Sequence, residues 1–489
     1  MSEATQVNFT KAAVQGTTVR YLIFFSSKLL LFVSTAILAR LLTKDDFGVV
    51  GFAVTTINFL DVISSLGVGP ALIYHPESDR TSSTAFWANL AISFTICAVA
   101  WAIAPAMAIY FRDPRATDVI RILSLSYPIS SIGDTYGSLL AKKLSFNRTF
   151  LPEFLRAMVK GFSSIGFAYA GFGAWSLIIG QICGEATATA VYYYSLSWRP
   201  SFLVDRQTLK SLLNYGVKYV GADIVSVILL NLDYVLVGRF LGAEALGVYT
   251  LAFKLPDLIV LQFARSLSSV IFPIYSKMRD IPGSMAKGYL MTTRYISLIT
   301  VPLGLGLALV AEPFTHLVFT DKWIEAVPAI QGIAIYALLL SLSYNAGGAY
   351  KASGKPQINT WTGLFRLSLL FPALWWAVAV AKSIVAVSWA HALVALIGTT
   401  VYTYVAARML EIPLIRVGGA LAPALSSGAL MAVVVFGYLQ LTADANAWVQ
   451  LIGGVLLGGI IYAASLWFFQ REVITDALDI VKSLRKKKN

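Results

Sequence analysis

Apolar stretches of about 20 residues or more recur along almost the whole chain. Each is long enough to cross the hydrocarbon core of a bilayer, about 30 Å thick, as one helix. Of the 489 residues, 57% are hydrophobic and only 13% are charged, whereas a soluble domain carries about 25% charged residues. The strands of an outer-membrane barrel are shorter, at about 10 residues, and alternate in polarity. The sequence therefore predicts an all-α polytopic membrane protein.

About fourteen membrane-spanning helices are predicted, joined by short loops. They cover 19–42, 47–71, 84–109, 118–140, 151–171, 174–196, 212–237, 245–273, 288–311, 326–349, 358–380, 383–407, 418–440 and 447–469. No loop is long enough for a separate catalytic domain, so we expect no enzyme and no catalytic residues. Lys and Arg gather in alternate loops and in the C-terminal segment, which predicts that both termini are cytoplasmic. The polar first twenty residues predict no removable signal peptide.

An internal repeat organises the chain. The segment RLLTKDDFGVV at 40–50 aligns with RFLGAEALGVY at 239–249, an offset of 199 residues. Both segments join the first and second spans of their halves on the same predicted side, which indicates parallel repeats. The alternative is a chance likeness between short helix connections.

The repeat predicts two six-helix lobes around a central cavity that opens to alternate faces of the membrane. The predicted boundaries are 1–205 for the N-terminal lobe and 206–410 for the C-terminal lobe. Residues 411–489 add two further helices and a basic cytoplasmic tail attracted to anionic lipid.

Ionisable residues inside spans are costly, so they are the best candidates for function. Four cations are predicted to hold an anionic group in the cavity: Lys28, Lys254, Arg265 and Arg366. Four acids are predicted to balance them or to bind a coupling ion: Asp61, Asp257, Asp223 and Glu185. On a regular helix, Lys254 and Arg265 would share a face to within about 20°. The alternative is internal ion pairs, such as Lys254 with Asp257, that only fasten helices together.

The remaining motifs predict no metal and no cofactor. His75, His316 and His391 are dispersed, and no Gly-rich loop precedes a lysine. Cys97 and Cys183 fall inside apolar spans, where a thiol packs as a small hydrophobe. The net charge of +13 is spread over short loops, so we expect no nucleic-acid partner.

Several segments resemble the Wzx-type lipopolysaccharide and exopolysaccharide flippases. These belong to the multidrug/oligosaccharidyl-lipid/polysaccharide exporter superfamily. The matching segments include LSFNRTF at 144–150, GFGAWSL at 171–177, SWRP at 197–200, NLDYVLVGRFLGAEALGVYTLAFKLP at 231–256 and ASGKP at 352–356. The resemblance is collinear from about residue 10 to about residue 410, and the last two spans match only in kind.

The resemblance implies a substrate and a place. The substrate is an oligosaccharide repeat unit linked by diphosphate to undecaprenol, which is flipped across the bacterial inner membrane by alternating access. Because the sequence has no motif for nucleotide hydrolysis, we expect an ion gradient or the substrate's own gradient to drive transport. The implied partners are membrane lipids, a polysaccharide polymerase and chain-length proteins. The family has no universal catalytic motif, so the headgroup role of Lys28, Lys254, Arg265 and Arg366 rests on their position within spans.

Three alternatives stay open. A cation-coupled drug exporter of the same superfamily would favour acids in its cavity, whereas the charges here are balanced or cationic. A glycan polymerase or ligase would require large external loops with clustered Arg and His. A scaffold subunit predicts that replacing the charges within spans leaves glycan export intact.

Overall fold

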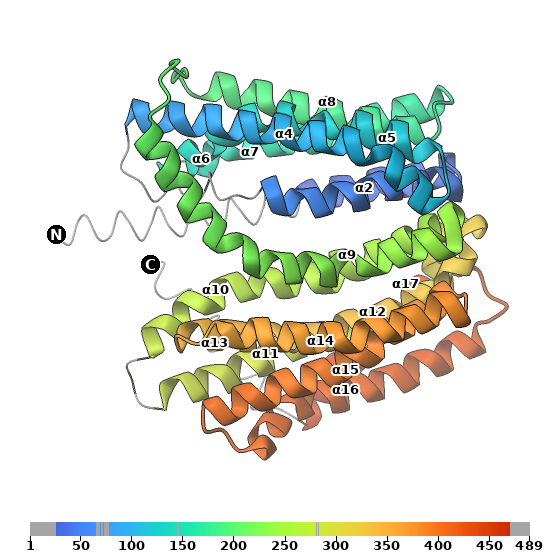
Figure 1. Ribbon diagram of the computed structural model, residues 1–489. Coiled ribbons are helices and arrows are strands. Elements are labelled where there is room, and N and C mark those ends of the chain that lie inside the picture. Colours follow the sequence, from blue (N-terminus) through green and yellow to red (C-terminus); the bar gives the residue numbers. More distant parts are fainter. Residues whose placement is uncertain are drawn as a thin grey trace. The chain divides into compact units, whose positions relative to one another are not determined.

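The computed structural model describes residues 26–64, 69, 72, 78–143, 146–279, 281 and 283–469. Within these residues the chain is almost entirely helical and contains no strand. It divides into two compact units, Met1–Thr250 and Leu251–Asn489 (Figure 1). The predicted all-α class is confirmed.

The first unit is built from helices that pack side by side. They are residues 26–41, α2 (Lys44–Ser64), α4 (Asp79–Phe111), α5 (Arg115–Ser124), α6 (Ser126–Lys142), α7 (Phe146–Tyr169), α8 (Ala174–Ser195) and most of α9 (Arg206–Pro256). Helix α8 packs against α6 and α7, and α4 packs against α2, α5 and α6. Two glycines on α8 allow close approach to α7: a Cβ on Gly180 would lie 1.9 Å from the hydroxyl oxygen of Ser164, and one on Gly184 would lie 2.9 Å from the carbonyl oxygen of Arg156.

The second unit continues the helical pattern. It contains the π-turn η1 (Asp257–Leu261), α10 (Gln262–Met278), α11 (Ser284–Val318), the 3₁₀ turn η2 (Asp321–Ala326), α12 (Val327–Ser341), α13 (Tyr344–Ala352), α14 (Gln357–Trp375), the π-turn η3 (Trp376–Val380), α15 (Ile384–Met409), α16 (Leu414–Leu441) and α17 (Ala447–Phe469). Helix α11 packs against α12, α16 and α17, and α15 packs against α12 and α14.

Every predicted span overlaps a helix, but several helices differ from the predicted ones. The span 118–140 is divided at Leu125 into α5 and α6. The loop expected between 237 and 245 is instead a kink inside α9, where Gly242 has φ 86° and ψ −175°. A glycine tolerates this backbone conformation because it lacks a Cβ. Eight helices of the described residues are long and apolar enough to cross a membrane, while the count of fourteen and the boundaries at 205 and 410 stay predictions.

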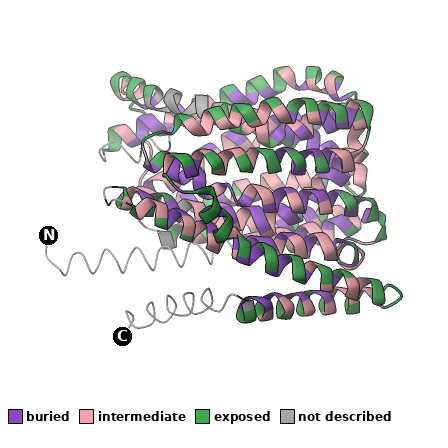
Figure 2. Cartoon of the chain, turned by 90° about the horizontal axis from the view of Figure 1, so that it is seen from below, coloured by how far each residue is buried: buried purple, intermediate pink, exposed green. Residues whose placement is uncertain are grey.

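Large apolar side chains remain exposed on the outer faces of the helices. On α15, Trp389, Leu393 and Leu396 follow one helical face and are 49%, 59% and 50% exposed. Figure 2 shows buried and exposed residues alternating along the same helices. Leaving such faces in water would cost about 25 cal/mol per Å² of apolar surface. Lipid is therefore their solvent, and the protein is a multi-pass membrane protein.

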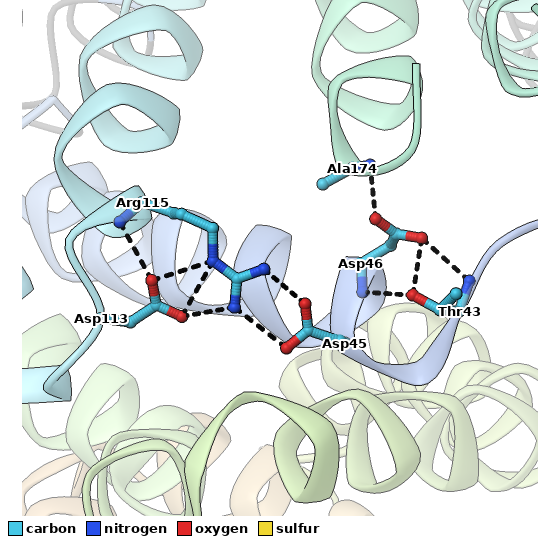
Figure 3. Close-up of polar contacts among 6 residues, drawn as sticks. All are labelled: Thr43, Asp45, Asp46, Asp113, Arg115 and Ala174. Atoms are coloured by element: carbon cyan, nitrogen blue, oxygen red, sulfur yellow. Dashed lines mark hydrogen bonds and ion pairs between the residues drawn. The ribbon is translucent and has the colours of Figure 1, made fainter. Parts of the chain in front are cut away.

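Two neighbouring aspartates fasten the start of α2 to other helices of the first unit (Figure 3). The Arg115 guanidinium donates to Asp45 at 2.5 and 3.0 Å and to the Asp113 carboxylate at 2.7 Å. Asp46 accepts a hydrogen bond from the backbone N–H of Ala174, the first residue of α8, at 2.8 Å. Hydrogen bonds from Arg115 are the main reason that the pKa of Asp113 lies below its ordinary value. Helices α2, α5 and α8 are thus linked by charge-assisted contacts.

Candidate functional site

In the second unit, Arg265 forms an ion pair with an acid that lies eight residues earlier in the chain. The guanidinium of Arg265, on α10, donates to the Asp257 carboxylate at 2.5 Å and to the Gln262 side-chain oxygen at 3.0 Å. Both charged side chains are partly accessible, at 36% for Arg265 and 40% for Asp257. The ion pair is therefore not sealed in the core.

A π-turn separates Arg265 from Lys254. Residues Asp257–Leu261 form η1 directly after Pro256, the last residue of α9. Because a π-turn bonds residue i to i+5 and widens the helix, the 20° relation expected on a regular helix does not carry across it. Lys254 is exposed near the end of α9. From the sequence, Lys254 is a candidate ion-pair partner of Asp257. The structure instead pairs Asp257 with Arg265.

Arg366 reaches the same region from α14. Its guanidinium donates to the Tyr336 hydroxyl at 3.0 Å and lies 5.6 Å from the centre of that ring. The Tyr344 side chain interacts electrostatically with both Arg265 and Arg366. The fold therefore gathers these two predicted cations around tyrosines of α12 and α13.

The partners of Arg366 are neutral. Among the described residues it forms no ion pair with a carboxylate, and its buried Nε has no hydrogen-bond partner. The Tyr336 ring also contacts His391, whose ring centre is 4.9 Å away and which is only 2% exposed. A desolvated guanidinium without a countercharge favours a nearby anion.

The first unit contains a different network, centred on an arginine that the sequence did not single out. Arg156, on α7, lies 3.0 Å from Glu153 and 3.2 Å from Glu185. Tyr192 donates to Glu153 at 2.9 Å, and Gln181 donates to Glu185 at 2.9 Å. Gly184 permits this pairing because it lets α8 approach the backbone of Arg156. One predicted acid, Glu185, thus shares its cation with a second glutamate.

Asp134, on α6, belongs to the electrostatic surroundings of that network. It interacts with Arg156, Glu185, Glu153 and Asp61. Asp61 itself, on α2, interacts electrostatically with the side chain of Tyr127, whose hydroxyl donates to the carbonyl oxygen of Ile57 at 2.8 Å. Acids therefore outnumber the central arginine here. The sequence carried a partial clue, because Glu153 and Arg156 are spaced i,i+3 on one helix.

The other two predicted residues are not placed in either group. Lys28 is half-buried in the helix at 26–41. Asp223 lies on α9, but its side chain is outside the described part of the structure. The candidate site is therefore carried by Arg265, Arg366 and Asp257, with Lys254 on the same unit.

Comparison with known proteins identifies the family. Residues 37–328 match the model of the polysaccharide biosynthesis protein family, so the chain belongs to that family. It is 26% identical to the teichuronic acid biosynthesis protein TuaB of Bacillus subtilis over 78% of this chain and 79% of TuaB. It is 25% identical to the succinoglycan biosynthesis transport protein ExoT of Rhizobium meliloti over 92% of each chain.

Solved structures identify the fold. The lipid II flippase MurJ, in an inward closed conformation, matches with a TM-score of 0.75 and 16% identity over 93% of this chain and 99% of MurJ. An inward-facing multidrug resistance transporter of the MATE family, from the MOP superfamily, matches with a TM-score of 0.63 and 15% identity over 78% of this chain and 94% of that one. The chain therefore has the fold of MOP-superfamily transporters, and its family points to transport rather than catalysis.

Proposed function

We propose that this protein flips an undecaprenyl-diphosphate-linked oligosaccharide from the cytoplasmic to the periplasmic leaflet of the bacterial inner membrane. The observation that carries the proposal is that Arg265 and Arg366 both interact with Tyr344, while Asp257, bonded to Arg265, is the one acid bonded to either arginine among the described residues. The relatives named for teichuronic acid and succinoglycan biosynthesis support a glycan substrate.

A diphosphate needs such a site because it cannot cross hydrocarbon unaided. Moving an isolated ion into a medium of low dielectric constant costs tens of kcal/mol on an idealised estimate. Arginine offsets the lost hydration with paired, charge-assisted hydrogen bonds that match phosphate geometry. Arg366 offers an unused Nε donor, and Arg265 becomes available when Asp257 gives way to the headgroup. Lys254 and Lys28 add positive charge along the path.

The proposal includes a mechanism and a setting. Two parallel six-helix lobes expose the headgroup site alternately to the two faces of the membrane, while the polyprenyl tail stays in lipid. The carboxylates around Arg156 and Asp61 serve ion coupling or charge balance. Both termini lie in the cytoplasm, and a polysaccharide polymerase and chain-length proteins use the flipped unit.

Alanine substitution of the two arginines tests the function. Arg265→Ala and Arg366→Ala, at unchanged membrane levels, are expected to abolish surface glycan and to retain the lipid-linked unit on the cytoplasmic leaflet. Arg408→Ala is the matched control, because Arg408 is an exposed arginine of the same unit whose side chain, among the described residues, bonds the Tyr404 hydroxyl. Normal surface glycan in both test variants would exclude the headgroup role and favour a scaffold.

A cation-coupled drug exporter is the second candidate, supported by the MATE fold match and by the acids around Arg156. It makes the opposite prediction. Glu185→Gln would then abolish efflux of cationic drugs, whereas Arg366→Ala would leave that efflux unchanged.

A further inference from the structure

The two copies of the repeated motif contact each other through their glycines, within the first unit. A Cβ on Gly48 would lie 1.7 Å from the carbonyl oxygen of Ala243, and a Cβ on Gly247 would lie 1.9 Å from the carbonyl oxygen of Lys44. Ala243 is the counterpart of Lys44 at the offset of 199 residues, just as Gly247 is the counterpart of Gly48. The contact is therefore reciprocal, as at a two-fold axis.

Glycine is required at both positions for the helices to come this close. Both of these Cβ distances fall far below van der Waals contact, and the obstructing atom is backbone rather than a flexible side chain. An alanine at either position would force α2 and α9 apart. The next turn repeats the relation, because a Cβ on Gly51 would meet the Leu246 side chain at 2.9 Å.

The acids next to the two glycines differ in how strongly they are bound to other helices. On the α2 side, Asp45 and Asp46 bind α5 and α8 through Arg115 and the N–H of Ala174. The counterpart of Asp45 is Glu244, which is 70% exposed and pairs only with Lys44, at 3.7 Å, in the described part of the chain. An exposed pair of this kind contributes roughly 0–1 kcal/mol.

Two single hydrogen bonds also link α9 to α4 and to α2, and Gly238 of α9 packs against the rings of Phe52 and Phe111. Arg239 donates to the carbonyl oxygen of Tyr110 at 2.6 Å, and Asn58 donates to Asn231 at 2.8 Å. No charge-assisted bond between carboxylate and guanidinium crosses from α9 to α2 among the described residues. The α2–α9 contact thus depends mainly on the close fit of backbones and apolar side chains, which separate without breaking a carboxylate–guanidinium bond among the described residues.

We infer that the repeated motif is a closing contact, in which Gly48 and Gly247 meet at one end of the protein and separate during each transport cycle. This inference rests on the proposed transport function. On one side of the contact, α2 moves together with α5 and α8, to which it is bonded. On the other side is α9, which continues past Thr250 to Pro256 and the π-turn that precedes Arg265. Opening of the contact is therefore coupled along one helix to the headgroup site.

Distance measurements between spin labels test the inference. Labels are placed at Lys44→Cys and Glu244→Cys in a Cys97→Ser, Cys183→Ser background and measured by double electron–electron resonance in proteoliposomes. We expect a short-distance population and a second, longer one, with their ratio shifted by added undecaprenyl-diphosphate glycan. In Gly48→Ala or Gly247→Ala the ratio of short to long should fall at least about tenfold, since a clash of more than about 1.4 kcal/mol shifts an equilibrium by that factor.

Two controls make the result specific. Gly166→Ala, on α7, adds a Cβ with nothing within 4 Å and should leave the ratio unchanged. Labels at Asp118→Cys on α5 and Trp175→Cys on α8, both exposed positions on helices bound to α2, should give one distance under all conditions. A single short distance at 44 and 244 in every sample, unaffected by Gly48→Ala, would overturn the inference.

A locked variant separates this inference from the proposed function. Joining Lys44→Cys to Glu244→Cys with a short bifunctional thiosulfonate reagent should stop glycan flipping, and a reducing agent should restore it. Full flipping by the joined protein would show that the contact never opens. If the distances shift with Gly48→Ala but the unmodified protein flips no glycan, the closing contact stands and the substrate assignment fails.

Discussion

The two units carry ionic networks of opposite balance. In the first unit one arginine, Arg156, is shared by Glu153 and Glu185, with Asp134 in electrostatic reach. In the second unit Arg265 and Arg366 both interact with Tyr344, and the acid Asp257 is paired with Arg265. Similar helical frames thus surround an acid-rich group in one unit and a cation-rich group in the other. This contrast supports the proposal that the second unit binds the anionic headgroup, and ion coupling or charge balance stays a prediction for the acids of the first unit.

Reversing the charge of the second unit should have the largest effect. Arg366→Glu places a carboxylate where a diphosphate is proposed to bind, and we expect flipping in proteoliposomes to fall by at least about 100-fold, which corresponds to about 2.7 kcal/mol. Arg366→Lys keeps the charge but loses the paired donors, so it should retain part of the rate. Equal flipping rates for Arg366→Glu and Arg366→Lys would show that the positive charge of the second unit does not matter for transport.

Removing Arg156, the arginine of the first unit's network, should mainly lower the stability of the folded protein. Arg156→Ala removes the arginine that contacts both Glu153 and Glu185 and leaves Lys160 as the cation that acts on Glu185. Breaking a buried pair costs about 3–5 kcal/mol. Because Arg156 is 28% exposed, we expect a loss of about 2 kcal/mol, measured as a lower midpoint of thermal unfolding in detergent. Adding Glu185→Gln should recover part of the loss. A double variant less stable than Arg156→Ala would contradict the proposed pairing.

Releasing Arg265 from its acid should have a smaller effect. Asp257→Asn removes the internal counter-ion, so the headgroup no longer competes with it, and binding of undecaprenyl diphosphate should tighten by up to about tenfold, or 1.4 kcal/mol. Turnover should fall because release slows. Isothermal titration and flipping rates measured on the same sample check this prediction, and weaker binding would assign Asp257 to substrate positioning instead.

Removing an acid at the start of α5 should have the smallest effect. The pKa of Asp113 is lowered by Arg115, so its contribution to stability is present above the unfolded-state pKa and is lost as the pH falls through the lower folded-state pKa. Asp113→Asn should therefore lower stability by about 1 kcal/mol at neutral pH and by less in acid. Unfolding midpoints at the two pH values test the sign, and an unchanged midpoint at neutral pH would show that the Arg115–Asp45 pair suffices.

The structure brings together some of the residues named from the sequence, while their role in binding stays a prediction. Arg265, Arg366 and Asp257 come together, and Glu185 has an arginine partner, yet that partner was not singled out because Arg156 falls near the start of a span. The prediction that Lys254 and Arg265 share a helical face assumed a regular helix. A π-turn between them changes the rotation, and no sequence pattern predicted that turn. Whether two charges on different helices meet depends on the packing of those helices, which glycines such as Gly184 control.

The sequence alone determined the helical class, the membrane as solvent and the positions of most helices, since run length and hydropathy are local properties that lipid enforces on each segment. It also revealed the repeat. Only the tertiary structure decided which charges meet, because a pairing depends on the rotation and depth of two separate helices. It also decided that Gly48 and Gly247 face each other's backbones, since a contact between residues 199 positions apart depends on how the whole unit packs.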